Sequence, residues 1–383
     1  MRRWVLPGVV AFLVTGLPHA SAVPVVAPQQ AWTHQFGGVL RDEAHAVAAT
    51  SGGIYLAGDT HAVLPGQSSA GDVDAFVRKY GPIGDVVWTR QFGSPSQDFA
   101  RAVAATPSGI YVAGFTRGVL PGQSSAGDDD AFVRKYDVDG NVVWTRQFGS
   151  AEFDIVAGVA ATPAGIYVAG YAESVLPGES SAGAGDAFVR KYDVDGNVVW
   201  TRQFGSASED FASGVAATSG GIYVAGDTRG VLPGESSAGA EDAFVRKYDI
   251  DGNVVWTRQF GSADWEEVHA VAATSTGIYV TGDSPGVLPG QSSAGGEDAF
   301  VRKYDADGNV GWTHQFGRRS YDSATGVRAT PAGIYVAGYT SRTLPGQTSA
   351  GYRDAFVRRY DAVGNIVWTR QFGSAGSDTA HAV

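Results

Sequence analysis

Carboxylate side chains recur at one position of this sequence, ten residues after a tryptophan that itself returns every 56 residues. In five of the seven copies an aromatic residue lies directly beside the carboxylate. A ring of carboxylates could attract cations or polar ligands, and the aromatic side chains could serve as stacking platforms. The acidic residues are Asp42, Asp98, Asp154, Asp210, Glu266, Asp322 and Asp378, and the aromatic residues are Phe99, Phe153, Phe211, Trp265 and Tyr321.

The same residues also have a structural interpretation. A carboxylate at the beginning of a strand can accept backbone hydrogen bonds, and an aromatic side chain there can cover the contact between two repeats. Both interpretations stay open, because a repeated column alone does not distinguish them. In the ligand-binding hypothesis, the candidate residues are Asp98, Phe99, Phe153, Asp154, Asp210, Phe211, Trp265, Glu266, Tyr321 and Asp322.

A short acidic motif, Asp-x-Asp-Gly-Asn, offers weaker candidates for a metal site. Alternating Asp residues before Gly resemble calcium loops, in which a hard cation takes several oxygens from a tight turn. The motif is short, however, and Phe148 occupies the offset at which an EF-hand places its bidentate Glu. A plain turn is therefore favoured, and we predict no cofactor, with calcium as the alternative. The calcium candidates are Asp137, Asp139, Asp193 and Asp195.

Residues for catalysis are sparse. The sequence has no nucleophile elbow, paired-histidine metal motif or phosphate-binding loop. Where three repeats have histidine, the others have Arg, Ala, Ser or Thr, which indicates that no histidine has a fixed partner. We therefore predict that the protein is not an enzyme, with a hydrolase or lyase as the minor alternative. The histidines after the first 22 residues are His34, His45, His61, His269, His314 and His381.

A second repeated column pairs an Asp with an Arg four residues later, as in Asp130 and Arg134. Side chains an even number of residues apart lie on one face of a strand. We therefore predict a salt bridge within or between repeats, repeated six times around the molecule. Binding of a ligand by this Asp is the alternative.

The composition excludes several classes of protein. The 383 residues include 53 Gly and no Cys, and the formal net charge is −11. Without Cys there are no disulfides, thiolate metal sites or cysteine nucleophiles. A pI of about 5.0 argues against a nucleic-acid partner. Glycine is present at about twice its usual share, which favours a repetitive β protein.

The first 22 residues have the features of a secretory signal peptide. Arg2 and Arg3 precede an apolar run over residues 4–17, and small residues lead to a cleavage point after Ala22. The run is too short to span a bilayer. We predict export by the general secretory route, a linker over 23–31, no membrane span after cleavage, and a secreted, extracellular or cell-surface location.

The elements that position the acidic column follow from the 56-residue period. Each unit contains four short apolar runs separated by turn residues, and in the unit from Trp88 these cover 88–92, 102–106, 110–113 and 131–136. Four strands per repeat is typical of one propeller blade. We predict an all-β propeller of four-stranded antiparallel blades over residues 32–383, with six complete repeats and a partial seventh. The run with the smallest side chains should lie innermost and the tryptophan strand outermost.

The repeated motifs also carry a family resemblance. DAFVRKYD at 130–137, GN at 140–141, WTRQFG at 144–149 and GIYVAG at 165–170 resemble the bacterial seven-bladed β-propeller repeat family. The resemblance covers 32–383 and implies a secreted or surface propeller with no shared enzymatic activity. This chain departs from the family by encoding six complete units. We therefore expect six blades with leftover end segments, and a seven-bladed arc lacking half a blade as the alternative.

Strand alternation predicts which face of the propeller binds a ligand. The loops after the second and fourth strands emerge on one face and are the longer ones, as functional loops usually are. We expect a secreted, non-catalytic monomer that presents equivalent loops for multivalent binding of a glycan or protein at a cell surface or matrix. A structural scaffold of the cell envelope without a dedicated ligand is the main alternative.

Overall fold

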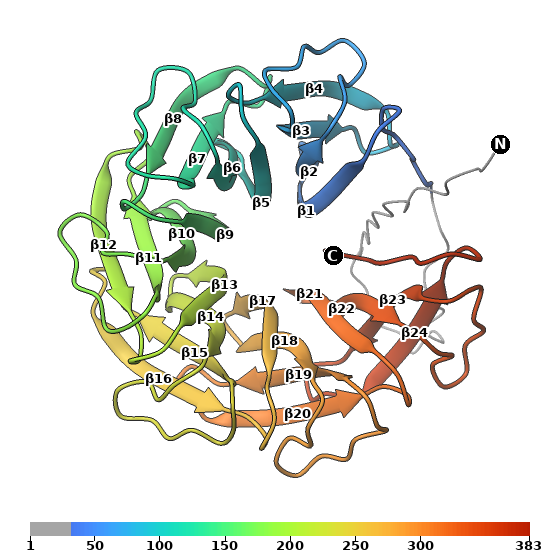
Figure 1. Ribbon diagram of the computed structural model, residues 1–383. Helices are drawn as coiled ribbons and strands as arrows, with labels where there is room; N and C mark the ends of the chain where they lie inside the picture. Colours follow the sequence, from blue (N-terminus) through green and yellow to red (C-terminus); the bar gives the residue numbers. More distant parts are fainter. Residues whose placement is uncertain (1–31) are drawn as a thin grey trace.

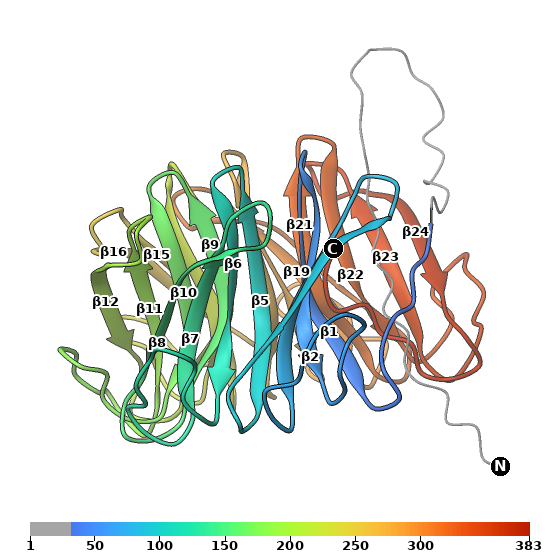
Figure 2. The ribbon, with the colours of Figure 1, turned by 90° about the horizontal axis from the view of Figure 1, so that it is seen from above.

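The computed structural model describes residues 32–383, so the predicted signal peptide and linker lie outside the described residues. The chain forms 24 strands in six four-stranded antiparallel sheets, which are arranged as blades around a ring (Figure 1). Viewed edge-on, the strands run between the two faces of this ring (Figure 2). Within residues 32–383 no helix is long and apolar enough to cross a membrane. The predicted all-β propeller fold is confirmed.

The first strand of each blade lies innermost, as predicted from its small side chains. Successive inner strands approach closely: a Cβ added at Gly158 would lie 2.9 Å from the Cα of Gly214 in the next blade. Larger side chains at this position would push the blades apart. The inner strands are β1 (Asp42–Thr50), β5 (Asp98–Thr106), β9 (Asp154–Thr162), β13 (Asp210–Thr218), β17 (Glu267–Thr274) and β21 (Asp322–Thr330).

The second strands are buried almost throughout, which explains their apolar residues on both faces. Each second strand contains a glycine where the backbone of the inner strand approaches too closely for a side chain. A Cβ at Gly114 would lie 1.8 Å from the carbonyl oxygen of Phe99. The second strands are β2 (Gly53–Thr60), β6 (Gly109–Thr116), β10 (Gly165–Ala172), β14 (Gly221–Thr228), β18 (Gly277–Ser284) and β22 (Gly333–Thr340).

The third and fourth strands complete each blade in the predicted order. The third strands are β3 (Asp74–Tyr80), β7 (Asp130–Tyr136), β11 (Asp186–Tyr192), β15 (Asp242–Tyr248), β19 (Asp298–Tyr304) and β23 (Asp354–Tyr360). The fourth strands, on the outside, are β4 (Val86–Phe92), β8 (Val142–Phe148), β12 (Val198–Phe204), β16 (Val254–Phe260), β20 (Val310–Phe316) and β24 (Ile366–Phe372). Blade 1 is therefore β1–β4, and blade 6 is β21–β24.

Aromatic side chains join each blade to the next. Trp88 on the outer strand of blade 1 packs against Tyr136 of blade 2, with ring centroids 6.3 Å apart. Phe92 meets Phe132 edge-on at 5.7 Å, and the Arg134 guanidinium lies 4.2 Å from the Phe92 ring. The same contacts recur around the ring, so the repeated Trp and Phe residues are core residues of the contacts between blades.

The N-terminal described segment repeats this packing without belonging to a blade. Trp32 lies 6.1 Å from Tyr80, and Phe36 meets Phe76 edge-on at 5.6 Å. These are the contacts that Trp88 and Phe92 make with the following blade. Residues 32–36 therefore lie on blade 1 where the outer strand of a preceding blade would lie.

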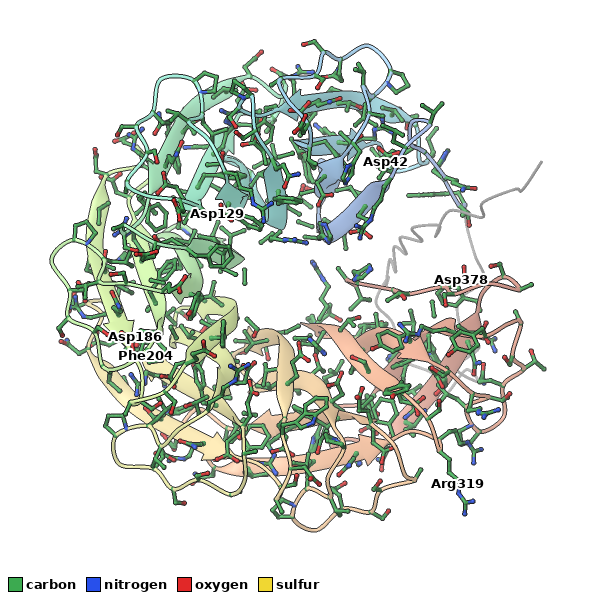
Figure 3. All side chains as sticks on the ribbon, viewed as in Figure 1. Asp42, Asp129, Asp186, Phe204, Arg319 and Asp378 are labelled. Atoms are coloured by element: carbon green, nitrogen blue, oxygen red, sulfur yellow. The ribbon has the colours of Figure 1, made fainter. Side chains whose placement is uncertain are left out.

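The C-terminal segment occupies the complementary place on blade 6. Thr325 donates a hydrogen bond to the carbonyl of Ala380, and a Cβ added at Gly326 would lie 3.0 Å from the Cα of Ala382. Ala382 thus meets blade 6 as Gly214 meets blade 3. Asp42 and Asp378 lie on either side of the sector between blade 6 and blade 1 (Figure 3).

The number of blades differs from the one that the family resemblance implies. Residues 32–383 form six four-stranded blades, because the chain supplies second and third strands for six units only. The end segments take the places of an inner and an outer strand in the remaining sector. A seven-bladed ring is therefore wrong for the described residues, and the prediction of six blades is confirmed.

The predicted Asp–Arg salt bridges are also wrong for the described residues. Asp130 accepts hydrogen bonds from the backbone of Ala126 and from Gln147, whose Nε2 lies 2.7 Å from Oδ2. Arg134 instead donates to the hydroxyl of Thr145, at 2.8 Å. Four residues along a strand span about 13 Å, so sharing a face does not bring the two charges together.

Candidate functional site

The acidic residues of blades 2 to 6 lie at the beginning of the inner strands and are buried, whereas Asp42 and Asp378 are half-buried. Asp98 is 0% exposed, and its Oδ2 accepts hydrogen bonds from the Ser94 backbone at 2.7 Å and the Ser94 hydroxyl at 3.1 Å. Asp154 and Asp210 make the same contacts with the serine four residues before them. Glu266 contacts Ser262 in the same way. This geometry agrees with the structural interpretation, and ligand binding by these carboxylates stays a prediction.

Burial changes the chemistry of this acidic column. It raises the pKa of Asp154 and of Asp322 to about 6, against the hydrogen bonds that lower it. Burial likewise raises the pKa of Asp98, Asp210 and Glu266. Each carboxylate has a nearby second acid and no salt-bridge partner among the described residues. Arg190 and Arg318 lower the pKa of Asp154 and Asp322 from a distance, but burial outweighs them.

Three of the five aromatic candidates belong to one continuous row. Phe99 stacks on Phe115 with ring centroids 4.7 Å apart, and Phe115 lies 5.9 Å from Phe153. Tyr171 continues the row, 6.3 Å from Phe153, and stacks on Phe211 at 4.3 Å. We call these five residues the aromatic row. It crosses blades 2 to 4, so its members cover contacts between blades.

The other two aromatic candidates are more exposed. Trp265 precedes blade 5 and is 36% exposed, and Tyr321 precedes blade 6 and is 54% exposed. Neither is part of the aromatic row. The structure thus separates the predicted platforms into a packed group and two accessible side chains.

All of these residues lie on one face of the ring, which carries the beginnings of the inner strands and the ends of the second strands. We call it the entrance face. Positions that differ between repeats gather there. The last but one residue of the second strand, for example, is acidic in blades 1, 4 and 5 and aromatic in the others. These residues are Asp59, Phe115, Tyr171, Asp227, Asp283 and Tyr339.

Acidic residues gather on the entrance face at blades 4 and 5. Burial and a hydrogen bond with Glu241 raise the pKa of Asp227 well above its usual value. Burial, with neighbouring carboxylates, also raises the pKa of Glu267 and of Glu297. We call Asp227, Glu241, Glu267, Asp283 and Glu297 the acidic arc. At Asp227, Glu267 and Glu297 burial is the largest cause of the raised pKa, and neighbouring carboxylates add to it.

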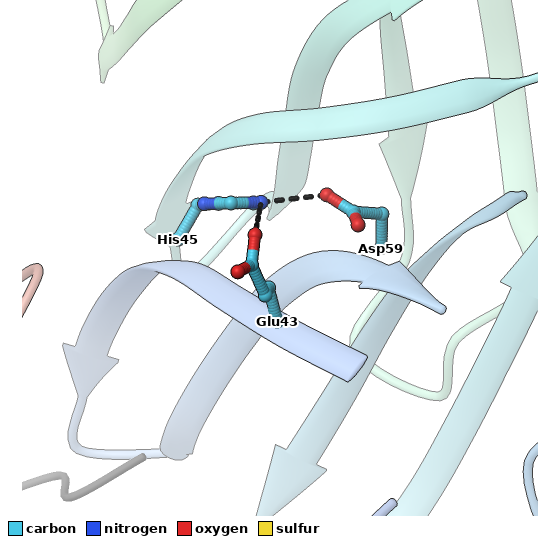
Figure 4. Close-up of side chains that lie close together, drawn as sticks. All are labelled: Glu43, His45 and Asp59. Carbon is cyan, nitrogen blue, oxygen red and sulfur yellow. Dashed lines mark hydrogen bonds and ion pairs between the residues drawn. The ribbon is translucent and has the colours of Figure 1, made fainter. Parts of the chain in front are cut away.

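Two histidines lie among carboxylates on this face. In blade 1, His45 Nε2 lies 2.6 Å from Asp59 Oδ1 and 3.8 Å from Glu43 Oε2 (Figure 4). In blade 5, His269 Nε2 lies 2.8 Å from Asp283 Oδ2, and its Nδ1 lies 3.9 Å from Glu267 Oε1. In each triad the ligand atoms lie within 4.8 Å of one another.

The triads result from a local irregularity of the inner strand. Glu43 pairs with Asp59 across the strands, and the register shifts between Ala44 and Ala46, so His45 is the extra residue of a β-bulge. A bulge re-aims the side chain that it carries. Blade 5 repeats this arrangement, with its shift between Val268 and Ala270.

The prediction that no histidine has a fixed partner is therefore wrong. His45 and His269 each have a Glu two residues before and an Asp fourteen residues after. Burial lowers the pKa of His269, but the Asp283 carboxylate more than offsets this, so the pKa is raised overall. The shared spacing was the available signal, and it is visible only when two repeats are compared apart from the other four.

The weak calcium candidates form ordinary turns. Asp137 Oδ1 accepts hydrogen bonds from the backbone of Asp139 and Asn141 at 2.9 and 2.8 Å, and Oδ2 accepts one from the Asn141 side chain. These bonds lower the pKa of Asp137. Asp193 makes the same set of contacts, and Asp195 corresponds to Asp139. Calcium binding at these hairpins stays a prediction.

The chain resembles one curated protein at low identity. It is 23% identical over 395 residues to the regulatory protein FlaEY of Caulobacter vibrioides, covering 87% of this chain and 40% of that protein. The chain thus spans about two fifths of the length of this relative. A scan of protein-family models found none that matches the chain.

A solved propeller domain supports the fold. The WD40 domain of Pan2 from Neurospora crassa is 13% identical, with a TM-score of 0.52, and the match covers 89% of this chain and 82% of that domain. The WD40 propeller domain of Doa1 is 9% identical, with a TM-score of 0.49, covering 89% and 85%. Likeness of this degree concerns the fold alone, and one fold can host both enzymes and binding domains.

Proposed function

We propose that this protein is a secreted, non-catalytic binding propeller whose entrance face takes a glycan or protein ligand at a cell surface or matrix. The observation that carries the proposal is a separation of residues. The aromatic residues that join the blades are shared by the repeats and largely buried, whereas the residues that differ at the end of the second strand and before the inner strand lie on the entrance face. Trp265 and Tyr321 remain accessible there, next to the acidic arc.

The same face also carries the repeated loop between the second and third strands. Its sequence is Val-Leu-Pro-Gly followed by Gln or Glu, with small changes, and its first residue is about half exposed in five copies. A ligand of repeating chemistry, such as a polysaccharide, would contact several copies at once. Each bound copy raises the effective concentration of the ligand at the next. The exposed first residues are Val63, Val119, Val175, Val231 and Val287.

The experiment is a binding screen of the purified protein against immobilised glycans and cell-surface proteins. We expect saturable binding that the double variant Trp265→Ala, Tyr321→Ala weakens at least tenfold, because exposed aromatic rings supply contact area. Val363→Ala is the matched control, since this side chain is 73% exposed on the opposite face. Equal binding by the double variant and the control would contradict the proposed surface.

Absence of any saturable ligand would favour the scaffold alternative. The name of the relative, a regulatory protein, supports a role in binding rather than catalysis but names no ligand. The predicted export is part of the proposal, and cell fractionation tests it. A panel of glycoside, ester and lactone substrates tests the non-catalytic part, and turnover of any of them at a rate above the control protein would contradict it.

A further inference from the structure

The blade 5 triad has the donor set of a metal site. Glu267 and His269 come from β17, Asp283 comes from the neighbouring β18, and the register places Glu267 opposite Asp283. Their three ligand atoms lie within 4.8 Å of one another. Two carboxylates and one imidazole from a rigid pair of strands are ligands that divalent transition metals accept.

Two buried polar atoms beside this triad have no partner. Asp283 is 3% exposed, and its Oδ1 accepts no hydrogen bond. Thr281 is 0% exposed, and its hydroxyl likewise has no partner. Because Thr281 is two residues from Asp283 on β18, both side chains lie on the same face of the strand. Unpaired buried polar groups cost free energy, which a bound ion or its water would recover.

The hydroxyl is specific to this blade. At the position of Thr281 the other five blades have alanine. Alanine fills this place without a polar atom, so the packing of the blade does not require the hydroxyl. A buried polar atom beside a triad of metal-ligand type therefore points to a ligand rather than to the core. The five alanines are Ala57, Ala113, Ala169, Ala225 and Ala337.

The blade 1 triad shows how the same residues are compensated without an ion. The Arg101 guanidinium lies 3.1 Å from His45 Nε2, and Arg41 pairs with Glu43. Arg41 thus interacts with both carboxylates of that triad, directly with Glu43 and more weakly with Asp59. In blade 5, Thr325 stands at the position of Arg101 and Trp265 at that of Arg41.

The surroundings of the blade 5 triad are instead acidic. After burial, the Glu241 carboxylate helps to raise the pKa of Asp227 and of Glu267, and Asp283 and Glu267 help to raise the pKa of Glu297. Arg229 pairs with Glu241 at 3.3 Å, and Arg353 lies 4.1 Å from the Tyr339 ring, so neither arginine forms an ion pair with the triad. Positive charge is thus lacking where blade 1 has it.

We propose that Glu267, His269 and Asp283 bind one divalent transition-metal ion of the zinc class. The imidazole ligand disfavours calcium and magnesium, which prefer oxygen ligands only. The Glu267 side chain is 58% exposed, so solvent or a ligand reaches the ion from the entrance face. The site lies on the same face as the exposed aromatic side chains but does not use them, and it goes beyond the proposed binding function.

The test is calorimetric titration of the purified, EDTA-treated and dialysed full chain with ZnCl2, and separately with CaCl2. We expect one equivalent of Zn²⁺ to bind and Ca²⁺ to bind at least 100-fold more weakly. His269→Ala and Glu267→Gln should each abolish the Zn²⁺ site, while His45→Ala should leave it unchanged. Glu267→Gln keeps size and shape at an exposed position, so it guards against a folding defect in the histidine variant.

Several results would overturn the proposal. One is the absence of saturable Zn²⁺ binding. Another is unchanged Zn²⁺ binding in His269→Ala or Glu267→Gln, measured on a variant whose melting temperature equals that of the wild type. A third is loss of the single Zn²⁺ equivalent in His45→Ala. Calcium binding as tight as zinc binding would also overturn it, because it would show that the imidazole is not a ligand. Failure of the glycan and protein screen would leave this result unaffected, so the two proposals are separately testable.

Discussion

Blade 1 and blade 5 contain the same Glu-x-His and Asp residues on the same strands, yet their surroundings differ in charge. In blade 1 the Arg101 guanidinium lies 3.1 Å from the imidazole of His45. For blade 5 the equivalent residue of the next blade is Thr325, and the two carboxylates of the triad belong to the acidic arc. The comparison shows that a repeat protein can turn one structural motif into two different sites by changing the residue that the next blade contributes.

The largest effect should come from placing beside the blade 5 triad the arginine that lies beside the blade 1 triad. In Thr325→Arg the new guanidinium would lie beside His269 and oppose a divalent ion. Two unit charges about 4 Å apart near a protein surface interact by about 4 kcal/mol, so Zn²⁺ affinity should fall about 1,000-fold. Calorimetric titration measures this. The control is Thr325→Val, which removes the same hydroxyl and should retain Zn²⁺ binding.

A second effect extends the comparison to the buried acidic column, whose carboxylates have no salt-bridge partner among the described residues. Burial raises the pKa of Asp154 from 3.8 to about 6. A carboxyl with a raised pKa in the folded state contributes stability below its unfolded pKa, and this contribution is lost as pH rises from about 4 to about 6. The loss amounts to about 3 kcal/mol at neutral pH. In Asp154→Asn this part of the pH dependence should disappear.

The measurement is urea unfolding of the wild type and Asp154→Asn at pH 4.5 and pH 7. The exposed Asp137 provides a control of opposite sign, because hydrogen bonds from Asn141 lower its pKa. Its contribution is present above the unfolded pKa of 3.8 and is lost only as pH falls further, so Asp137→Asn should destabilise the protein at both pH 4.5 and pH 7. If Asp154→Asn follows the wild type at both pH values, the carboxylate is compensated and the account of the column is wrong.

The reverse exchange in blade 1 should create a second site. Arg101→Thr removes the guanidinium beside His45, while Arg41 still pairs with Glu43 and limits the gain. We expect a second equivalent of Zn²⁺ with an affinity about 30-fold above that of the wild-type blade 1, or about 2 kcal/mol. Calorimetry of Arg101→Thr in a His269→Ala background isolates this site. If Zn²⁺ affinity does not rise in this variant, the arginine is not the reason why the blade 1 triad lacks a metal site.

The smallest effect concerns the hydroxyl of Thr281. Leaving a buried polar group unpaired costs about 1 kcal/mol or more, so Thr281→Ala should stabilise the metal-free protein by about that amount. With saturating Zn²⁺ the gain should shrink, because the hydroxyl then has a partner. Thermal unfolding with and without Zn²⁺ measures the difference. An equal gain in both conditions would show that the hydroxyl does not take part in the site.

Much of the fold could be predicted from the sequence because it rests on local chemistry that recurs six times. The small residues of 102–106 place that strand innermost, and Trp88 places the outer strand against the next blade. The predicted salt bridge between Asp130 and Arg134 was wrong because two side chains on one face of a strand can still lie far apart. Contacts that depend on a distance across strands need the register.

The site was less predictable for a related physical reason. The predicted site consisted of residues shared by the repeats. Identity among repeats reflects packing, however, and most of the acidic column is buried accordingly. The triads depend on β-bulges that turn His45 and His269 toward the neighbouring strand, and no residue pattern in one repeat reveals a bulge. Comparing blades 1 and 5 with the others would have indicated the spacing but not the arginine beside one of them.

The most direct test of the account is anomalous diffraction at the zinc absorption edge from crystals of the full chain soaked in stoichiometric Zn²⁺. The account predicts one anomalous peak, bounded by Glu267, His269 and Asp283, and no peak at the blade 1 triad beside Arg101. A peak of equal height between Glu43, His45 and Asp59, or the absence of a peak in blade 5, would contradict the claim that charge from the next blade decides which triad holds an ion.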